Sequence, residues 1–284
     1  MAEEKKEEGN WFSSLMSGFG APASAEDAPA ASSNEGGTVD ASDSPENRLL
    51  KLKAEDVAKL PPAEAVAALN AAVVTSADVN VALIEACCKR LRVLCREPDN
   101  CKLCDEAGSC SAVVSAMGAL PTQPAVQLQA LAALVNLCSG ESNEHRANAV
   151  NAGAMQGIVG AMNALSADAE VQEMACIALQ NCCYGEDEHA VVRRRAAASQ
   201  GALEATMAAI RQHEASSPTL MEVAVATLRL MVHRADDIRE RAKELGAAPD
   251  WIKPIVQPAE GGSNGGLFSF RKLGFGTSRR KTKG

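Results

Sequence analysis

Four cysteines in the first half of the chain have the residue type and the close spacing that metal binding or redox chemistry requires. Cys95, Cys101, Cys104 and Cys110 form the pattern C-x5-C-x2-C-x5-C. Four thiolates could hold a zinc ion, and Cys101 and Cys104, one helical turn apart, could form a reactive or redox-sensing pair. Both chemistries depend on whether the elements that carry these residues let the sulfur atoms converge.

The histidines that could act as catalytic bases have no suitable partners around them in the sequence. His145 and His189 each follow a Gly-Glu dipeptide, which places both in corresponding loops. Neither is accompanied by a nucleophile elbow, a Walker glycine loop or a carboxylate–histidine metal spacing. The sequence therefore predicts that the protein is not an enzyme, and we expect no catalytic residue, metal or cofactor.

A recurring glycine indicates how the elements that carry these residues are organised. Glycine returns at intervals of 45, 48 and 45 residues, and a leucine precedes each of these glycines by 17 to 22 residues. The four pairs are Gly108 with Leu91, Gly153 with Leu134, Gly201 with Leu179, and Gly246 with Leu228. A fixed period in this range is typical of a solenoid, in which each unit buries its apolar face only by stacking on its neighbours. Such repeats usually provide extended binding surfaces.

Within each unit the apolar pattern predicts two longer helices and a short one. The second unit carries an amphipathic stripe over 126–138, and the third unit carries its equivalent over 171–183. A further helix then runs to the repeating glycine, and another follows it. The predicted helices cover 126–138, 143–152 and 155–165 in the second unit, and 171–183 and 203–210 in the third, with one between them that ends at Gly201.

The register of the repeats disfavours zinc binding by the four cysteines. Cys104 falls where Ala149 and Ala197 fall, at an inward-facing position, and Cys101 falls where Arg146 and Arg194 fall. A helix over these residues leaves the four sulfur atoms poorly placed to converge on one ion. Other cysteines lie inside predicted helices, where a thiol acts as a small core hydrophobe. These are Cys138, Cys176, Cys182 and Cys183.

The repeating segments resemble the armadillo repeat over about 76–257. The matching stretches are 133–138 and 178–183, and an arginine precedes a Gly-Ala dipeptide in three units, as Arg146 precedes Gly153-Ala154. The resemblance implies an all-α fold, a right-handed α-solenoid of about four three-helix repeats. The glycine between the second and third helices favours this family over HEAT repeats. In the armadillo family one helix of each unit lines a concave groove that binds extended peptides.

The resemblance also implies which residues would line such a groove. Asn136 and Asn181 occupy the position of an asparagine that bonds the backbone of a bound peptide, which an amide can do as donor and as acceptor. As an alternative, both amides could brace neighbouring helices. Ala132 and Ile177 stand where importin-like grooves place a tryptophan, so a receptor for basic nuclear signals is not expected. A helix or an apolar segment of a partner could be the ligand instead.

Both ends of the chain carry the same aromatic pattern, Phe-Ser-x4-Gly-Phe-Gly. One copy begins at Phe12 and the other at Phe268, and a large apolar residue precedes each copy. In tails that are otherwise rich in small and polar residues, such aromatic side chains are expected to dock into pockets of a partner. Two copies could engage one multimeric partner twice. The candidate tail residues are Trp11, Phe12, Phe19, Phe268, Phe270 and Phe275.

Charge is unevenly distributed along the chain. The formal net charge is -8, and residues 1–47 hold ten acids and two lysines, whereas residues 259–284 hold six bases and one acid. Membrane or nucleic-acid binding is therefore expected, if anywhere, only at the C-terminal tail, and a peripheral protein anchored there is the alternative function. The basic residues of this tail are Arg271, Lys272, Arg279, Arg280, Lys281 and Lys283.

We expect four segments along the chain. They are an acidic disordered tail over 1–47, capping helices over 48–75, the repeats over 76–257 and a flexible, disordered basic tail over 258–284. The acidic start has no basic segment followed by an apolar one, so a secretory signal is not expected and the thiols should be reduced. We therefore predict an intracellular, cytoplasmic adaptor or scaffold, with a nuclear or organellar location left open. It would bind one protein in the groove and another through its tails.

Overall fold

The structure, a computed structural model, describes residues 45–74, 80–140 and 142–255 of the 284-residue chain. Within these ranges the regular structure is helical and contains no strand. The elements are α2 (Pro45–Leu50), α3 (Ala54–Val57), α4 (Pro62–Val74), α5 (Val81–Leu94), α6 (Pro98–Glu106), α7 (Ser109–Ala119), α8 (Pro124–Leu137), α9 (Asn143–Asn151), α10 (Ala154–Ala164), α11 (Ala169–Cys183), α12 (Glu188–Ser199), α13 (Ala202–His213), α14 (Pro218–Met231), α15 (Asp236–Glu244) and the 3-10 helix η2 (Pro249–Ile252).

From α5 onward the helices follow one another in triplets that each begin with the longest helix. In the second unit α8 has 14 residues, α9 has 9 and α10 has 11. The helices α5–α7 repeat these lengths, so the predicted pattern of two longer helices and a short one is confirmed for two units. In the third unit α11 has 15 residues, and α12 and α13 have 12 each. The fourth unit differs, because the short helix η2 follows α14 and α15 where a third α-helix would be expected.

A glycine in the left-handed region ends each short helix. Gly153 has a φ of 87° between α9 and α10, and Gly108, Gly201 and Gly246 have φ values of 84°, 85° and 81° at the corresponding junctions. A residue with a Cβ atom is strained in this conformation, so the turn favours glycine. The 45- to 48-residue period of the glycines therefore marks the same turn in each unit.

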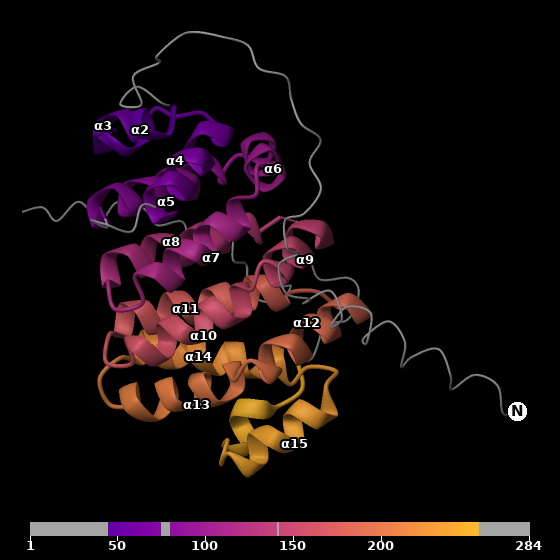
Figure 1. Cartoon of the computed structure of the whole chain (residues 1–284). Helices are drawn as coiled ribbons and strands as arrows, with labels where there is room; N and C mark the ends of the chain where they lie inside the picture. The colour runs from indigo at the N-terminus through magenta and orange to yellow at the C-terminus, as the bar shows by residue number, and fades with distance from the viewer. Residues whose placement is uncertain (1–44, 75–79, 141, 256–284) are drawn as a thin grey trace, which may run out of the picture. The chain divides into compact units, whose positions relative to one another are not determined.

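Equivalent helices of successive units lie side by side. The long helices α5, α8, α11 and α14 pack against one another in chain order, and α4, α7, α10 and α13 form a second row. Figure 1 shows the short helices α6, α9, α12 and α15 along one side of these rows. Each long helix thus contacts the long helix of the next unit, as expected of a solenoid.

The apolar core runs through the stack as one continuous cluster. The repeating leucines of the sequence pattern all have an exposed fraction of 0%: Leu91, Leu134, Leu179 and Leu228. Burying such a side chain contributes about 1.5–3 kcal/mol relative to leaving it in water. The ten cysteines are also buried, which confirms the core role expected for Cys138, Cys176, Cys182 and Cys183.

The predicted segment limits can be compared with the structure at only a few points. Helix α2 begins at Pro45, just before the expected limit at residue 47, and proline suits the first turn of a helix. The remaining limits stay predictions, because residues 1–44, 75–79 and 256–284 lie outside the described ranges. No helix in the described part of the chain combines the length and the apolar character needed to span a bilayer.

Candidate functional site

The four long helices share one stripe of equivalent positions, which we call the long-helix face and which is most exposed in α5. In α5 exposed and half-exposed side chains recur at intervals of four residues, at Glu85, Lys89 and Val93. Such spacing defines one stripe of a helix. The same position in the four long helices is held by Val93, Asn136, Asn181 and Leu230.

Asn136 lies half-buried on the long-helix face and connects α8 to α5. Its Nδ2 donates to the backbone oxygen of Arg92 at 2.6 Å, and Nη1 of Arg92 donates to Oε1 of Gln129 at 3.0 Å. The bracing role that the sequence left open is therefore present. This bond uses one of the two N–H groups of the amide, so the other N–H group and the amide oxygen can still face a ligand.

The other three predicted groove residues hold positions of the long-helix face but are buried. Asn181 has an exposed fraction of 9%, and its Nδ2 donates to the backbone oxygen of Ile177 at 3.0 Å. Ala132 and Ile177 each have an exposed fraction of 5%. The sequence analysis did not select Val93 as a site residue, although its exposed fraction is 39%. The sequence did contain a signal for it, because Val93 is apolar at the position where the second and third units have asparagine.

Three of the four long helices have a glutamate at one position of the long-helix face. Glu85, Glu173 and Glu222 hold this position in α5, α11 and α14, eight residues before the position of Asn181, whereas α8 has Leu128 there. Eight residues correspond to about 12 Å along a helix. Burial, and secondarily the negative charge of Glu170 one turn earlier, raise the pKa of Glu173. A cation bound beside Glu173 would relieve its repulsion from Glu170.

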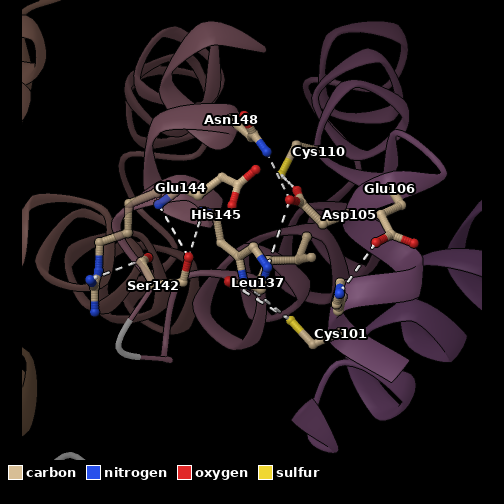
Figure 2. Close-up of polar contacts among 11 residues, drawn as sticks. Cys101, Asp105, Glu106, Cys110, Leu137, Ser142, Glu144, His145 and Asn148 are labelled. Atoms are coloured by element: carbon tan, nitrogen blue, oxygen red, sulfur yellow. Dashed lines mark hydrogen bonds and ion pairs between the residues drawn. The ribbon is translucent and has the colours of Figure 1, made fainter. Parts of the chain in front are cut away.

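A second polar cluster joins the first two units on the side of the short helices (Figure 2). Helix α9 begins after Ser142, whose hydroxyl accepts from the backbone nitrogens of Glu144 at 3.2 Å and His145 at 3.5 Å. His145 therefore lies in the first turn of α9, and His189 lies in α12. The loop positions predicted for both histidines are wrong, because each helix starts at a capping residue that precedes the histidine.

His145 lies between a thiol and a carboxylate that both come from α6. Its Nδ1 is 4.0 Å from Sγ of Cys101, and its Nε2 is 3.8 Å from Oδ2 of Asp105. The Asp105 side chain has an exposed fraction of 8%, and its Oδ2 accepts from Nδ2 of Asn148 at 2.8 Å. Figure 2 shows these groups pointing toward one another. Chemically, they can pass a proton from sulfur to imidazole and hold the resulting cation beside the carboxylate.

The four cysteines of the C-x5-C-x2-C-x5-C pattern do not share one environment. Hydrogen bonding with Cys95 lowers the pKa of the Cys101 and Cys104 thiols. Cys110 instead donates to Oδ1 of Asp105 at 3.7 Å, and burial raises its pKa. Among the residues that the structure describes, no group of three or more His, Cys, Asp or Glu side chains is arranged to hold a metal ion.

A cavity of about 300 Å³ lies beside this cluster. Asp105 and Cys110 form part of its wall, whereas Cys101 and His145 do not line it. The cavity is therefore a recess beside Cys110, and Cys101 lies outside its wall. Its lining residues are Asp105, Gly108, Cys110, Ser111, Asn148, Asn151 and Ala152.

The residues predicted to act in the two tails lie outside the described ranges. They are Trp11, Phe12 and Phe19 at the N-terminal end, and Phe268, Phe270, Arg271, Lys272, Phe275, Arg279, Arg280, Lys281 and Lys283 at the C-terminal end.

Comparison with known proteins gives structural matches alone. A scan against protein-family models finds no match, and neither does a search of curated proteins. The structure is similar to a designed armadillo repeat protein, YIII(Dq)4CqI, with 21% identity and a TM-score of 0.52, over 72% of this chain and 85% of that chain. It is also similar to an engineered protein from the Northeast Structural Genomics Consortium, with 23% identity and a TM-score of 0.52, over 72% of this chain and 89% of that chain.

Proposed function

Because the chain has an armadillo-like repeat fold, we propose that it is a non-catalytic adaptor whose long-helix face binds an extended segment of a partner protein. The observation that carries this proposal is the alignment of equivalent positions in four packed helices. Packed helices lie about 8–10 Å apart, and an extended chain rises about 3.3 Å per residue. Every third residue of the segment would thus meet the next helix.

The chemistry of the long-helix face indicates what such a segment carries. Glu85, Glu173 and Glu222 would attract lysine or arginine side chains on one edge of the segment. Val93 offers an exposed apolar contact about 12 Å away on the same helix as Glu85. Asn136, which is half-buried, would contribute its second N–H group and its amide oxygen while it keeps the bond to the Arg92 carbonyl. The partner segment would therefore be basic along one edge and apolar along the other.

Affinity purification with the intact chain and with variants of exposed positions tests this proposal. We expect Val93→Glu and the double variant Glu173→Gln with Glu222→Gln to lose a partner that the intact chain captures. Leu103→Glu is the matched control, because Leu103 has an exposed fraction of 50% and lies on α6, outside the long-helix face. Circular dichroism verifies that each variant is folded. Capture of the same partner by all variants would refute the role of this face.

The tails would hold a second partner through the duplicated aromatic pattern. The change of Phe12, Phe19, Phe268 and Phe275 to alanine is expected to remove that partner and to leave the partner of the long-helix face bound. If both partners persist, the tail part of the proposal is wrong and the part that concerns the face still stands.

The alternative is a peripheral protein anchored by its C-terminal tail. Its support is the excess of six bases over one acid in residues 259–284. Sedimentation with vesicles of phosphatidylserine and phosphatidylcholine, and titration with duplex RNA, would separate the two functions. Binding that falls with added salt and disappears without residues 259–284 would favour the alternative. Equal binding by the intact chain and by the chain without residues 259–284 would exclude the alternative function.

A further inference from the structure

One position of the repeat has a different chemistry in the first unit. Arg146 and Arg194, each seven residues before the repeating glycine, donate to backbone oxygens of the next unit. The acceptors are Asn181, at 3.2 Å, and His233, at 2.8 Å. The first unit has Cys101 at this position, and its Sγ donates weakly to the backbone oxygen of Leu137 in the next unit, at 3.9 Å. A thiol therefore replaces a guanidinium at the junction of the first and second units.

The residues around Cys101 can accept its proton and retain it. Nδ1 of His145 faces the sulfur at 4.0 Å, and Nε2 of the same ring faces Oδ2 of Asp105 at 3.8 Å. Because the two ring nitrogens face different partners, protonation at Nδ1 gives an imidazolium whose other N–H points to a carboxylate. Asn148 holds that carboxylate through a hydrogen bond of 2.8 Å. A Cys101 thiolate would thus be paired with a cation.

The groups around Cys101 shift the pKa of its thiol in different directions. Hydrogen bonding from Cys95, at the end of α5, lowers the pKa of the Cys101 thiol, and it outweighs burial and the charge of Asp105, which both raise that pKa. By contrast, burial raises the pKa of Cys87, Cys176 and Cys183 to about 12.

Access to solvent also distinguishes Cys101 from the other cysteines. Its exposed fraction of 6% is the largest among the ten, and that of Cys104, whose pKa is also lowered, is 0%. Reactive thiols combine a low pKa with some access to solvent.

We propose that Cys101 is a peroxide-reactive thiol, which hydrogen peroxide oxidises to a sulfenic acid. The Cys101 thiolate attacks one oxygen of hydrogen peroxide, so that an S–O bond forms and the O–O bond breaks. The departing hydroxide takes the proton held by His145 and becomes water. The Cys101 sulfur supplies the two electrons that reduce the peroxide and becomes a sulfenic acid.

This site does not depend on the proposed adaptor function. Oxidation of the sulfur would remove the S–H group that Cys101 donates to the Leu137 carbonyl group, so its effect would be felt at the junction of the first two units.

Mass spectrometry of the full chain tests the proposal. The reduced protein is treated with equimolar hydrogen peroxide in the presence of dimedone, which labels sulfenic acids, and each cysteine is followed in time. Cleavage after Arg96 and Lys102 separates Cys95 from Cys101 into different peptides. We expect the dimedone adduct of wild-type protein to accumulate at Cys101 about tenfold faster than at any other cysteine.

Variants of the two histidines separate a chemical role from a structural one. We expect His145→Gln to slow the labelling of Cys101 about tenfold or more, and His189→Gln, the matched control, to leave it unchanged because His189 is exposed on α12. Labelling of Cys101 in wild-type protein that is no faster than labelling of Cys104 or Cys110 would overturn the proposal. So would an unchanged rate in folded His145→Gln. The wild-type comparison needs no substitution, so it stands even if a variant fails to fold.

Discussion

Arg146 in α9 donates from its guanidinium Nε to the backbone oxygen of Asn181 in α11, at 3.2 Å. The guanidinium is buried, with an exposed fraction of 4% for the residue, and it lies 5.3 Å from the centre of the Tyr184 ring. One side chain therefore connects the second unit to the third and holds the end of a long helix. Because Asn181 belongs to the long-helix face, this buried arginine helps to position a surface that we propose binds a partner.

Arg194 makes the equivalent connection one unit later, and its removal should destabilise the chain. It has an exposed fraction of 0% and donates to the backbone oxygens of His233, at 2.8 Å, and Gly185. Hydrogen bonds to charged groups contribute about 1.5–3 kcal/mol each. We expect Arg194→Ala to lower the free energy of unfolding by about 2–4 kcal/mol, measured by urea denaturation.

Arg195 is the control for this prediction because it is the next residue but lies at the surface. Its side chain is 52% exposed and pairs with Asp237 at 3.1 Å. Exposed pairs of this kind contribute about 0–1 kcal/mol, so Arg195→Ala should change stability by no more than that. Equal losses in the two variants would contradict the role given to Arg194.

Buried glutamines stabilise the ends of the third helices. Nε2 of Gln172 donates to the backbone oxygens of Met162, at 2.9 Å, and Leu165, at 3.1 Å, and these carbonyl groups lie at the C-terminal end of α10. Helix ends leave such oxygens without helical partners. We expect Gln172→Leu to lower the free energy of unfolding by about 1–3 kcal/mol. Gln156→Leu on the exposed side of α10 should change it by less than about 0.5 kcal/mol, and thermal unfolding compares the two.

Two glycines of the second unit should respond to alanine with opposite signs. Gly153 has a φ of 87°, and a left-handed conformation costs a residue with a Cβ atom about 1–2 kcal/mol. Gly160 lies in the interior of α10, where an added Cβ would meet no atom within 4 Å. Alanine there should raise stability by about 0.5–1 kcal/mol. The midpoint of thermal unfolding should therefore fall in Gly153→Ala and rise in Gly160→Ala, and a shift of the same sign in both would count against this interpretation.

The repeat architecture could be predicted because its determinants are local in sequence. The left-handed turn after each short helix selects glycine, so the glycine period reports the unit length directly. The apolar stripe over 126–138 predicted a helix that the structure places at Pro124–Leu137. Both signals depend on a few neighbouring residues, and both predictions agree with the structure to within about two residues.

The candidate sites could not be predicted to the same extent because they depend on contacts between units. Cys101 and His145 are 44 residues apart and meet only because α6 and α9 are brought together by the stack. The burial of Asn181 likewise depends on its place in the packed stack, a feature that the sequence pattern around an asparagine does not encode. The sequence predicted which positions are equivalent, but it did not predict which of them remain exposed.

The N-terminal cap of α12 predicts how stability depends on pH. The Asp187 carboxylate accepts from the backbone nitrogen of Ala190 at 2.8 Å and from Nδ2 of Asn143 at 2.6 Å, and the first of these bonds is the main reason that its pKa is lowered. A carboxyl group whose pKa is lower in the folded state stabilises the folded protein. Its contribution is complete above the unfolded pKa, about 4, and is lost as the pH falls through the folded pKa.

Asp187→Asn keeps an acceptor oxygen but does not titrate. Wild-type protein should therefore be more stable than Asp187→Asn at pH ~6, and the difference should vanish below about pH 3. Asp187→Ala, which also lacks the cap, should lose about 1 kcal/mol at pH ~6. Urea denaturation at several pH values measures all three proteins, and a constant difference between wild type and Asp187→Asn would show that the charge of the carboxylate does not stabilise the helix.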